Sequence, residues 1–338
     1  MRQIVTTNNG GVEVLRVEEK PDPRPKAGEV TIRVRAAGIN FADILARQGL
    51  YPDGPSKPCV MGYEVAGVVE ELGEDVNPEL AGKSVVALTR FGGQSEMVVV
   101  KATQIFQKPE QLTFEQAAAV PVNYLTAYAL IVVMGSLHES EAILIHNVGG
   151  GVGLAALDIA KHIGAETYGT ASPGKHEFLR ERGLDHPIDY RNQDWLPVLK
   201  QMTGGRGVEL VIDPIGGGHW KKSYAALCHT GRLGMFGVST ASANGLRGKL
   251  KLLKAAAQMP RFHPLSLLSQ NRGVFGLNLG HMWHEPEKVR AWTKEIIRGV
   301  EEGWVRPYVD RTFKFEQAGE AHSHIESRRN IGKVVLVP

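Results

Sequence analysis

The chain has 338 residues, of which 43% are hydrophobic and 22% are charged, and its formal net charge is +3. This size and hydrophobic content suffice for two globular domains with sizeable cores. The small net charge provides no general basic field, so we expect no nucleic acid partner.

Cysteine content and hydropathy indicate the compartment. The two cysteines, Cys59 and Cys228, are too few for a disulfide framework or a four-cysteine zinc lobe, and they are typical of a reducing compartment. The N-terminus lacks the apolar region of a signal peptide, and no apolar run approaches the roughly 18 residues of a membrane-spanning helix. We therefore expect a cytoplasmic protein.

The first third of the chain consists of short strand patterns separated by turns. Apolar and alternating segments predict strands over 29–36, 65–70 and 83–88. A helix is expected to begin at Thr113, because Gln116 three residues later completes a capping-box pattern. We expect a domain boundary near residue 120.

The most informative stretch follows, where an apolar strand pattern beginning at Ala142 runs into a glycine cluster and then directly into a helix. Glycines let the backbone approach a pyrophosphate closely, and the helix N-terminus offers unpaired N–H groups. The match to G-x-G-x-x-G is partial, because Val148 stands where the first glycine would be. The alternative is a turn that merely joins strand to helix. We expect a dinucleotide to contact Gly150, Gly151, Val152 and Gly153.

The remaining patterns predict alternating strands and helices. Strand patterns over 166–171, 210–213 and 232–237 indicate a doubly wound parallel sheet of α/β class. Beyond them, the sequence predicts a strand over 274–279, a helix over 287–302 and strand-like segments over 305–315 and 332–337.

The end of the second strand of this sheet indicates which dinucleotide binds. An NAD site usually has Asp or Glu there to hold the ribose hydroxyls, whereas this chain has Thr170-Ala171-Ser172. Ser172 and Lys175 supply a hydroxyl and an ammonium group, which suit a 2′-phosphate. The alternative is that these two residues simply start the next helix. We expect NADPH rather than NADH.

An insertion near 241–271 predicts a short amphipathic helix. Its basic residues interleave with leucines, the basic ones being Arg247, Lys249, Lys251 and Lys254. Such a helix either contacts an anionic membrane, covers the substrate or is an ordinary surface helix.

Several segments resemble one family. They are 37–43 with 47–52, the Gly-x-Glu-x-x-Gly segment 62–67, the segment 122–128, and the stretches 262–274 and 330–338. Together they resemble the medium-chain dehydrogenase/reductases, within them the zinc-independent quinone oxidoreductase branch, and most nearly its synaptic vesicle amine transport protein subgroup.

The resemblance implies a fold and an assembly. It implies a Rossmann-type doubly wound parallel sheet over 121–283, which binds NADPH, and a β-rich GroES-like substrate domain built from both chain ends, 1–120 and 284–338. It also implies a homodimer in which nucleotide-domain sheets join edge to edge through Val274 to Leu279.

The resemblance also bears on metal and substrate. Asn40 and Tyr63 stand at positions that hold catalytic zinc in alcohol dehydrogenases, and neither is a normal zinc ligand, so we expect no metal. Without a Lewis acid, reduction of an isolated ketone loses charge stabilisation. A quinone or an α,β-unsaturated carbonyl is the expected acceptor, since it spreads the incoming charge.

Residue roles follow from matched positions. Asn40 is expected to hydrogen-bond the substrate, Tyr51 to polarise it or relay a proton, and Tyr63 is a hypothetical proton donor; otherwise Asn40 is a turn residue and Tyr51 a packed aromatic. The other expected cofactor contacts are Asn123 and Thr126 at the nicotinamide, Tyr190 and Arg328 with Ser172 and Lys175 at the 2′-phosphate, and Phe236, Gly237 and Asn278 at strand ends.

The alternative function is of another class. The chain would be an NADPH-binding adaptor or a vesicle- or membrane-associated protein with vestigial catalysis, and turnover would distinguish the two.

Overall fold

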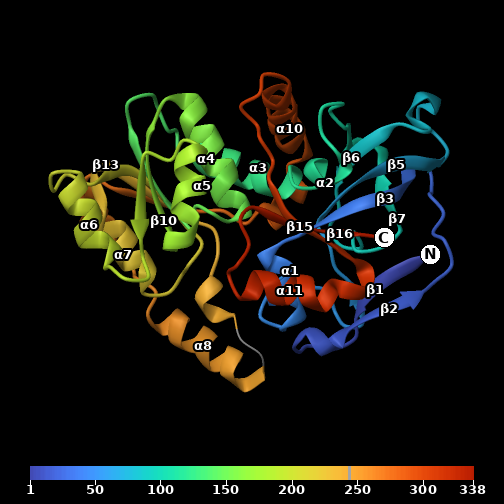
Figure 1. Cartoon of the computed structure of the whole chain (residues 1–338), viewed down its shortest axis with the longest axis horizontal. Coiled ribbons are helices and arrows are strands. Elements are labelled where there is room, and N and C mark those ends of the chain that lie inside the picture. The colour runs from blue at the N-terminus through green and yellow to red at the C-terminus, as the bar shows by residue number, and fades with distance from the viewer. Residues whose placement is uncertain (243–244) are drawn as a thin grey trace. The chain divides into compact units, whose positions relative to one another are not determined.

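The computed structural model describes residues 1–242 and 245–338, which divide into two compact units (Figure 1). Unit 1 comprises Met1–Asn123, Trp283–Glu302 and Pro307–Pro338, and unit 2 comprises Tyr124–Met282 and Gly303–Arg306. The expected boundaries at 120 and 284 lie close to this division. The division also assigns 303–306 to unit 2, which the sequence did not indicate.

Unit 1 is rich in strands. Its larger sheet has the order β15-β16-β3-β5-β6-β8, with β7 also paired to β3, and its smaller sheet has the order β2-β1-β4. The strands are β1 (Arg2–Thr6), β2 (Leu15–Glu19), β3 (Glu29–Ile39), β4 (Cys59–Val60), β5 (Glu64–Leu72), β6 (Ser84–Leu88), β7 (Met97–Lys101), β8 (Ile105–Gln107), β15 (Val309–Lys314) and β16 (Lys333–Val337). The helices are α1 (Phe41–Arg47), α2 (Phe114–Ala117), α10 (Pro286–Glu301) and α11 (Ala318–Glu326).

The two chain ends meet in this sheet. The C-terminal strand β16 pairs antiparallel with β3, Val335 opposite Gly38, and red and blue strands lie together in Figure 1. The expected substrate domain built from both chain ends is confirmed. Alternating residues of β3 and β5 supply its core, including Ile32, Val34 and Val65.

Unit 2 has a six-stranded sheet in which every pair is parallel, with the order β11-β10-β9-β12-β13-β14. Its strands are β9 (Ala142–His146), β10 (Glu166–Ala171), β11 (His186–Asp189), β12 (Val208–Asp213), β13 (Leu227–Met235) and β14 (Gly273–Gly276). Its helices are α4 (Gly151–Ile163), α5 (His176–Glu181), α6 (Trp195–Met202), α7 (His219–Ala225), α8 (Gly245–Ala257) and α9 (Pro264–Gln270). Helix α3 (Pro121–Tyr128) crosses the division between the units.

This strand order confirms the doubly wound Rossmann-type sheet. The chain moves outward from β9 through β10 to β11 and then returns to β12 on the other side of β9, so the order reverses between β9 and β12. Helices lie on both sides of the sheet (Figure 1), and Leu144 and Val211 on the two central strands are fully buried. Ligands of such sheets bind outside the carboxyl ends of the strands at this reversal.

Two sequence expectations differ from the structure. The pattern over 274–279 predicted a strand, but β14 ends at Gly276 and a 3₁₀ turn occupies Leu279–His284. The segment Phe114–Val133 is helical and apolar enough to span a membrane by length and composition, so the expectation that no run approaches this length was wrong. It is 72% buried, as the core helix of a soluble protein also is.

Candidate active site and nucleotide-binding loop

The glycine loop of unit 2 connects the carboxyl end of β9 to the first turn of α4. Gly150 is the N-cap of α4 and Asn147 has a φ of 54°. A Cβ at Gly153 would lie 2.3 Å from the carbonyl oxygen of Asn147 and 2.6 Å from that of Val148. Only glycine therefore fits where the helix packs against the loop, and the free N–H groups of the helix start lie at the carboxyl edge of the sheet.

A lysine lies beside this loop. Strand β10 ends at Ala171 and Ser172 caps the short 3₁₀ helix η5 (Pro173–Lys175). A Cβ built on Gly149 would lie 3.0 Å from Cδ of Lys175, so the lysine side chain passes directly over the glycine loop. The end of β10 thus offers a hydroxyl and an ammonium group beside a helix N-terminus, which together suit an anionic phosphate.

The other expected cofactor residues are divided between the units. In unit 2, Thr126 is buried in α3, and the rest follow strand ends: Tyr190 after β11, Phe236 and Gly237 after β13, and Asn278 after β14. Asn123 and Arg328 belong to unit 1, where Nδ2 of Asn123 donates to the carbonyl of Ala119 at 3.0 Å and Arg328 lies exposed just after α11. Their roles at the cofactor stay predictions.

In unit 1, Asn40 lies at the centre of a buried polar network. Nζ of Lys333 donates to Oδ1 of Asn40 at 2.7 Å and forms a short ion pair with Oε1 of Glu64. Nδ2 of Asn40 donates to the same carboxylate oxygen at 2.9 Å, and Oε2 of Glu64 accepts the backbone N–H of Val122 at 2.7 Å. The side chains of Lys333 and Glu64 are 3% and 0% exposed, so this pair is almost completely desolvated.

This network fixes the orientation of the Asn40 amide. An ammonium group can only donate and an ionised carboxylate can only accept, so Oδ1 must face Lys333 and Nδ2 must face Glu64. Among the hydrogen bonds of residues 1–242 and 245–338, the second N–H of Asn40 has no acceptor, so it can donate to a ligand. Gly38 is required beside it, because a Cβ there would lie 2.6 Å from Cε of Lys333 and 2.7 Å from Oε1 of Glu64.

Asp43 anchors the segment that carries Asn40. Its two carboxylate oxygens accept the backbone N–H groups of Asn40 at 2.8 Å and of Gly62 at 3.0 Å. Complete burial raises the pKa of Asp43 to about 7. The two backbone donors and the charge of Lys333 favour the ionised form and lower the pKa, but their effect is smaller than that of burial. Asp43 therefore joins the segment of Asn40 to that of Gly62.

Tyr63 belongs to a group of aromatic side chains. Its ring centroid lies 6.5 Å from that of Tyr51 and 5.5 Å from that of Phe91. Its hydroxyl is buried and has no hydrogen-bond partner within residues 1–242 and 245–338. Burial, followed by the charge of Asp43, raises the pKa of Tyr63 well above its ordinary value. The phenol therefore stays protonated and can donate a hydrogen bond, but it is a poor source of a proton.

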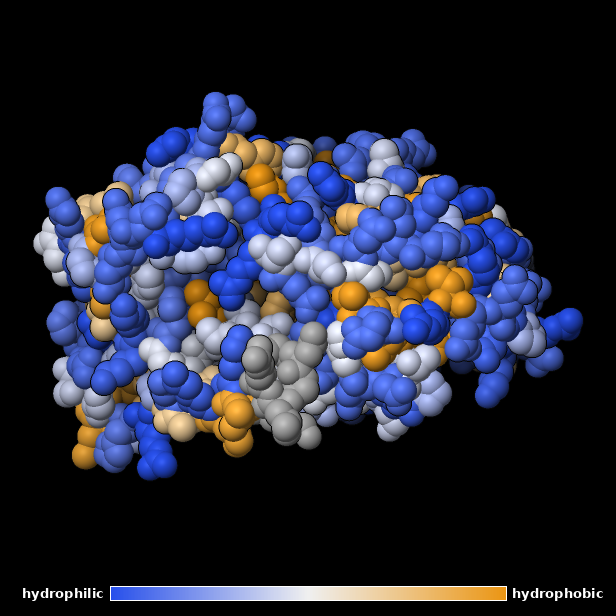
Figure 2. Space-filling view, turned by 60° about the horizontal axis from the view of Figure 1, so that its bottom comes forward, coloured by the Kyte–Doolittle hydropathy of each residue, from blue (hydrophilic) through white to orange (hydrophobic). Residues whose placement is uncertain are grey.

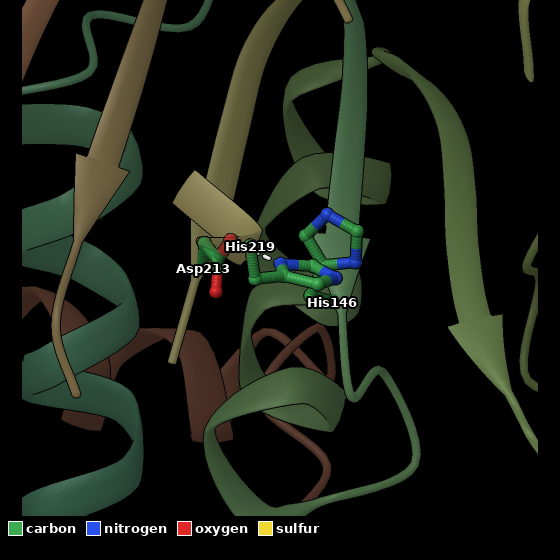
Figure 3. Close-up of side chains that lie close together, drawn as sticks. All are labelled: His146, Asp213 and His219. Atoms are coloured by element: carbon green, nitrogen blue, oxygen red, sulfur yellow. Dashed lines mark hydrogen bonds and ion pairs between the residues drawn. The ribbon is translucent and has the colours of Figure 1, made fainter. Parts of the chain in front are cut away.

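Sequence reasoning missed Glu64, Lys333 and a second buried cluster. In unit 2, His146, Asp213 and His219 have ligand-type atoms within 4.8 Å of one another, the one such group found in the described parts of the chain (Figure 3). The hydroxyl of Ser223 lies within hydrogen-bond distance of atoms of all three, so the space that an ion would need already holds an oxygen. Glu64 and Lys333 lie in the segments 62–67 and 330–338, which carried the family resemblance, but no role was predicted for either residue.

The raised pKa of Asp43 predicts how stability varies with pH. The unfolded chain ionises this carboxyl near 3.8 and the folded chain near 7, so the folded state binds the extra proton in that interval. The contribution of Asp43 to the free energy of unfolding is therefore present below about pH 4 and is lost as the pH rises through about 7.

Urea denaturation of wild type and Asp43→Asn at about pH 5 and pH 8 measures this effect, since the amide does not titrate. The advantage in stability of wild type over the variant should be smaller at the higher pH. An advantage that is equal at both pH values would contradict the assignment.

Comparisons with known proteins agree with this geometry. The alcohol dehydrogenase GroES-like domain matches residues 26–110, and the zinc-binding dehydrogenase domain matches residues 182–336. The synaptic vesicle membrane protein VAT-1 homolog of Danio rerio is 40% identical over 341 residues, which cover 99% of this chain and 69% of the relative. The quinone oxidoreductase of Pseudomonas aeruginosa is 32% identical over 333 residues, which cover 97% of each protein.

Solved structures extend the similarity to the whole fold. Escherichia coli quinone oxidoreductase complexed with NADPH has a TM-score of 0.88 at 30% identity and covers 100% of both chains. CurK enoyl reductase has a TM-score of 0.85 at 26% identity, and the match covers 99% of this chain and 98% of the CurK chain. The chain belongs to the medium-chain dehydrogenase/reductase family of oxidoreductases, close to the VAT-1 homologs and the quinone oxidoreductases.

Proposed function

We propose that this protein is an NADPH-dependent reductase that transfers hydride to a quinone or an α,β-unsaturated carbonyl without a catalytic zinc ion. The observation that carries the proposal is the buried Lys333–Glu64 pair, which leaves Asn40 a single N–H to offer. The quinone oxidoreductases and the enoyl reductase among the similar proteins support the acceptor class.

The residues of unit 2 fit NADPH. The glycine turn can receive the pyrophosphate at the start of α4, and Lys175, in the segment that follows β10, supplies a positive charge that suits a 2′-phosphate. No acid at the end of β10 would repel that phosphate, since Thr170 and Ala171 occupy the position. NADPH supplies a hydride when bound, and the protein's part is to hold and orient it.

The Asn40 amide suits an acceptor that develops negative charge on oxygen. Its N–H is oriented before the substrate arrives, so no reorganisation is needed when the charge appears. Asn40 is half-buried, whereas the pair that orients it is buried. We assign Asn40 the hydrogen bond to the enolate or phenolate oxygen.

The aromatic side chains suit a flat substrate. Rings such as Tyr51, Tyr63 and Phe91 pack well against planar conjugated systems. The Tyr63 hydroxyl stays protonated and is buried, so Tyr63 contributes its ring to this aromatic group. The hypothesis of Tyr63 as the proton donor stays a prediction. Proton relay by Tyr51 stays a prediction.

The residues at the family's zinc positions do not fit the metal. The Asn40 amide is already engaged by Lys333 and Glu64, and the raised pKa of Tyr63 keeps its hydroxyl from becoming a phenolate ligand. We therefore route no step of the reaction through zinc, although one matched domain is described as zinc-binding.

The edge strand of unit 2 supports the expected homodimer. Strand β14 is the last strand in the order of the six-stranded sheet, and an open edge can pair with a second copy. A dimer joined there and a cytoplasmic location stay proposals.

Acceptor-dependent oxidation of NADPH by purified, metal-stripped protein tests the proposal. We expect turnover with an ortho-quinone, a para-quinone or an alkyl enone, and a preference for NADPH over NADH. In Lys175→Ala this preference should fall about tenfold, because one charged contact to the 2′-phosphate is lost. Turnover that requires added zinc, or no turnover with any of the three acceptors, would contradict the proposal.

A second candidate function is a membrane-associated protein that binds NADPH. Residues 214–284 contain no Asp or Glu, and they carry Lys221, Lys222, Arg232, Arg247, Lys249, Lys251, Lys254, Arg261 and Arg272. Among the described side chains of this stretch, leucines are exposed on both helices: Leu250 and Leu253 on α8 by 65% and 67%, and Leu265 and Leu268 on α9 by 68% and 72%. Figure 2 shows hydrophobic orange surface beside hydrophilic blue surface in this part of the molecule. Exposed leucines with basic neighbours suit an anionic lipid surface.

Sedimentation with phosphatidylcholine vesicles, with and without phosphatidylserine, tests the membrane function. Wild type should sediment with the anionic vesicles only, and less at high salt. Leu250→Ser/Leu253→Ser should sediment several-fold less while NADPH oxidation is retained. Equal sedimentation of the two proteins would exclude this surface as the contact.

A further inference from the structure

A buried cluster of polar side chains lies at the carboxyl ends of the two central strands of unit 2. His146 is the last residue of β9, Asp213 is the last residue of β12, and His219 is on α7 (Figure 3). Ser223 is on the same helix. The three residues His146, Asp213 and Ser223 are at most 1% exposed. The ring of Trp195 packs against His146, with ring centroids 4.6 Å apart. A polar group in such a place is costly unless it is fully hydrogen-bonded.

Ser223 connects the cluster. Its Oγ lies 2.6 Å from Oδ2 of Asp213 and 3.2 Å from Nε2 of His146. Nδ1 of His219 donates to the same Oδ2 of Asp213 at 2.6 Å. A hydroxyl has one hydrogen, and the carboxylate can only accept, so Ser223 donates to Asp213. Nε2 of His146 must then donate to Ser223.

The donor order continues to a third strand, β10. Burial lowers the pKa of His146 to about 3, so its ring is neutral and carries one N–H, at Nε2. Its Nδ1 then accepts the hydroxyl of Thr170, 3.0 Å away near the end of β10. The hydrogen bonds run in one consistent order from Thr170 through His146 and Ser223 to Asp213, which also accepts from His219.

At each end of this chain of hydrogen bonds, a side-chain oxygen accepts a backbone N–H group from a loop. The Thr170 hydroxyl oxygen accepts the N–H of Asn147, the first residue of the glycine loop, at 3.3 Å. Oδ1 of Asp213 accepts the N–H of Ile215, in the loop that follows β12, at 2.6 Å. These two loops leave the strands between which the strand order reverses. That reversal is where a dinucleotide binds in a sheet of this topology.

We propose that Ser223, Asp213 and His219 are positioning residues for the cofactor: their hydrogen-bonded chain through His146 holds the two loops at the sheet reversal in the conformation that receives the dinucleotide. The proposal rests on NADPH as the cofactor. None of the three needs to touch the cofactor, because each acts through the backbone N–H groups of Asn147 and Ile215.

Direct titration of full-length protein with NADPH, followed by nicotinamide fluorescence, tests the proposal without turnover. Ser223→Ala breaks the chain at its centre and should raise the Kd about tenfold, as should His219→Leu. His219→Asn should bind like wild type, since the Asn Nδ2 takes the position of the imidazole Nδ1 and keeps the donor to Asp213.

A core variant controls for loss of stability. Leu227 is fully buried at the opposite, amino end of β13, so Leu227→Ala lowers the melting temperature without touching the cluster. Its Kd should equal that of wild type. If Ser223→Ala and His219→Leu bind NADPH like wild type, or no more weakly than Leu227→Ala, the positioning role is wrong. If wild type itself binds no NADPH, the proposed cofactor fails and the inference fails with it.

Discussion

The buried ion pair between Lys333 and Glu64 is the constraint on which unit 1 depends. Two charges with side chains 3% and 0% exposed are tolerated only when their hydrogen bonds are complete. The chain completes them with Asn40 at the end of β3 and with the backbone of Val122 at the start of α3. The pair therefore joins the last strand of the chain to the segment that carries the candidate site residues.

This arrangement explains the chemistry that the site can perform. Where zinc would supply a positive charge to a developing oxyanion, we propose that this chain uses the neutral amide of Asn40, whose orientation the ion pair fixes. In the proposed reaction, a neutral donor suffices for acceptors that delocalise charge, and this favours quinones and enones over isolated ketones. Gly38 follows from the same packing, because no side chain fits against the pair.

Unit 2 also buries polar side chains, and their hydrogen bonds are completed by other side chains and by backbone N–H groups. Its central strands end in His146 and Asp213, which are buried where the cofactor loops begin. A neutral imidazole and a serine hydroxyl share the hydrogen bonds there, and the carboxylate of Asp213 accepts three of them. In the proposed role, this chain of hydrogen bonds supports the two loops, and the one carboxylate in it, that of Asp213, is neutralised by its donors.

What the sequence could predict depended on separation along the chain. Some features could be predicted because they depend on residues that are adjacent in the sequence. These are the glycine loop, the strands of the parallel sheet, and the pair Ser172 and Lys175. The roles of Asn40 and Tyr51 required the family resemblance. Lys333 was not predicted, because its partner Asn40 is 293 residues away and a lysine at the start of a strand is ordinarily exposed. Tyr63 was expected in the site, but its raised pKa required knowledge of its burial.

His146 and Asp213 were missed for a similar reason. Each stands at the end of an apolar strand pattern, where a polar residue normally marks only the start of a loop. Strands β9 and β12 are far apart in sequence, and only their parallel pairing brings the two residues together. The short strand β14 shows the same limit, since Leu277 to Leu279 continue the apolar pattern after the pairing has ended.

The most direct test of the central claim is the turnover of Asn40→Asp, which keeps the shape of the side chain but removes its N–H donor. With NADPH and the best quinone or enone, kcat should fall about 100-fold while the Kd for NADPH stays close to that of wild type. The melting temperature should fall as well, because a second carboxylate then faces Glu64 in place of the amide donor. A kcat equal to that of wild type in a folded, NADPH-binding variant would contradict the assignment of Asn40 as the donor to the acceptor's oxygen.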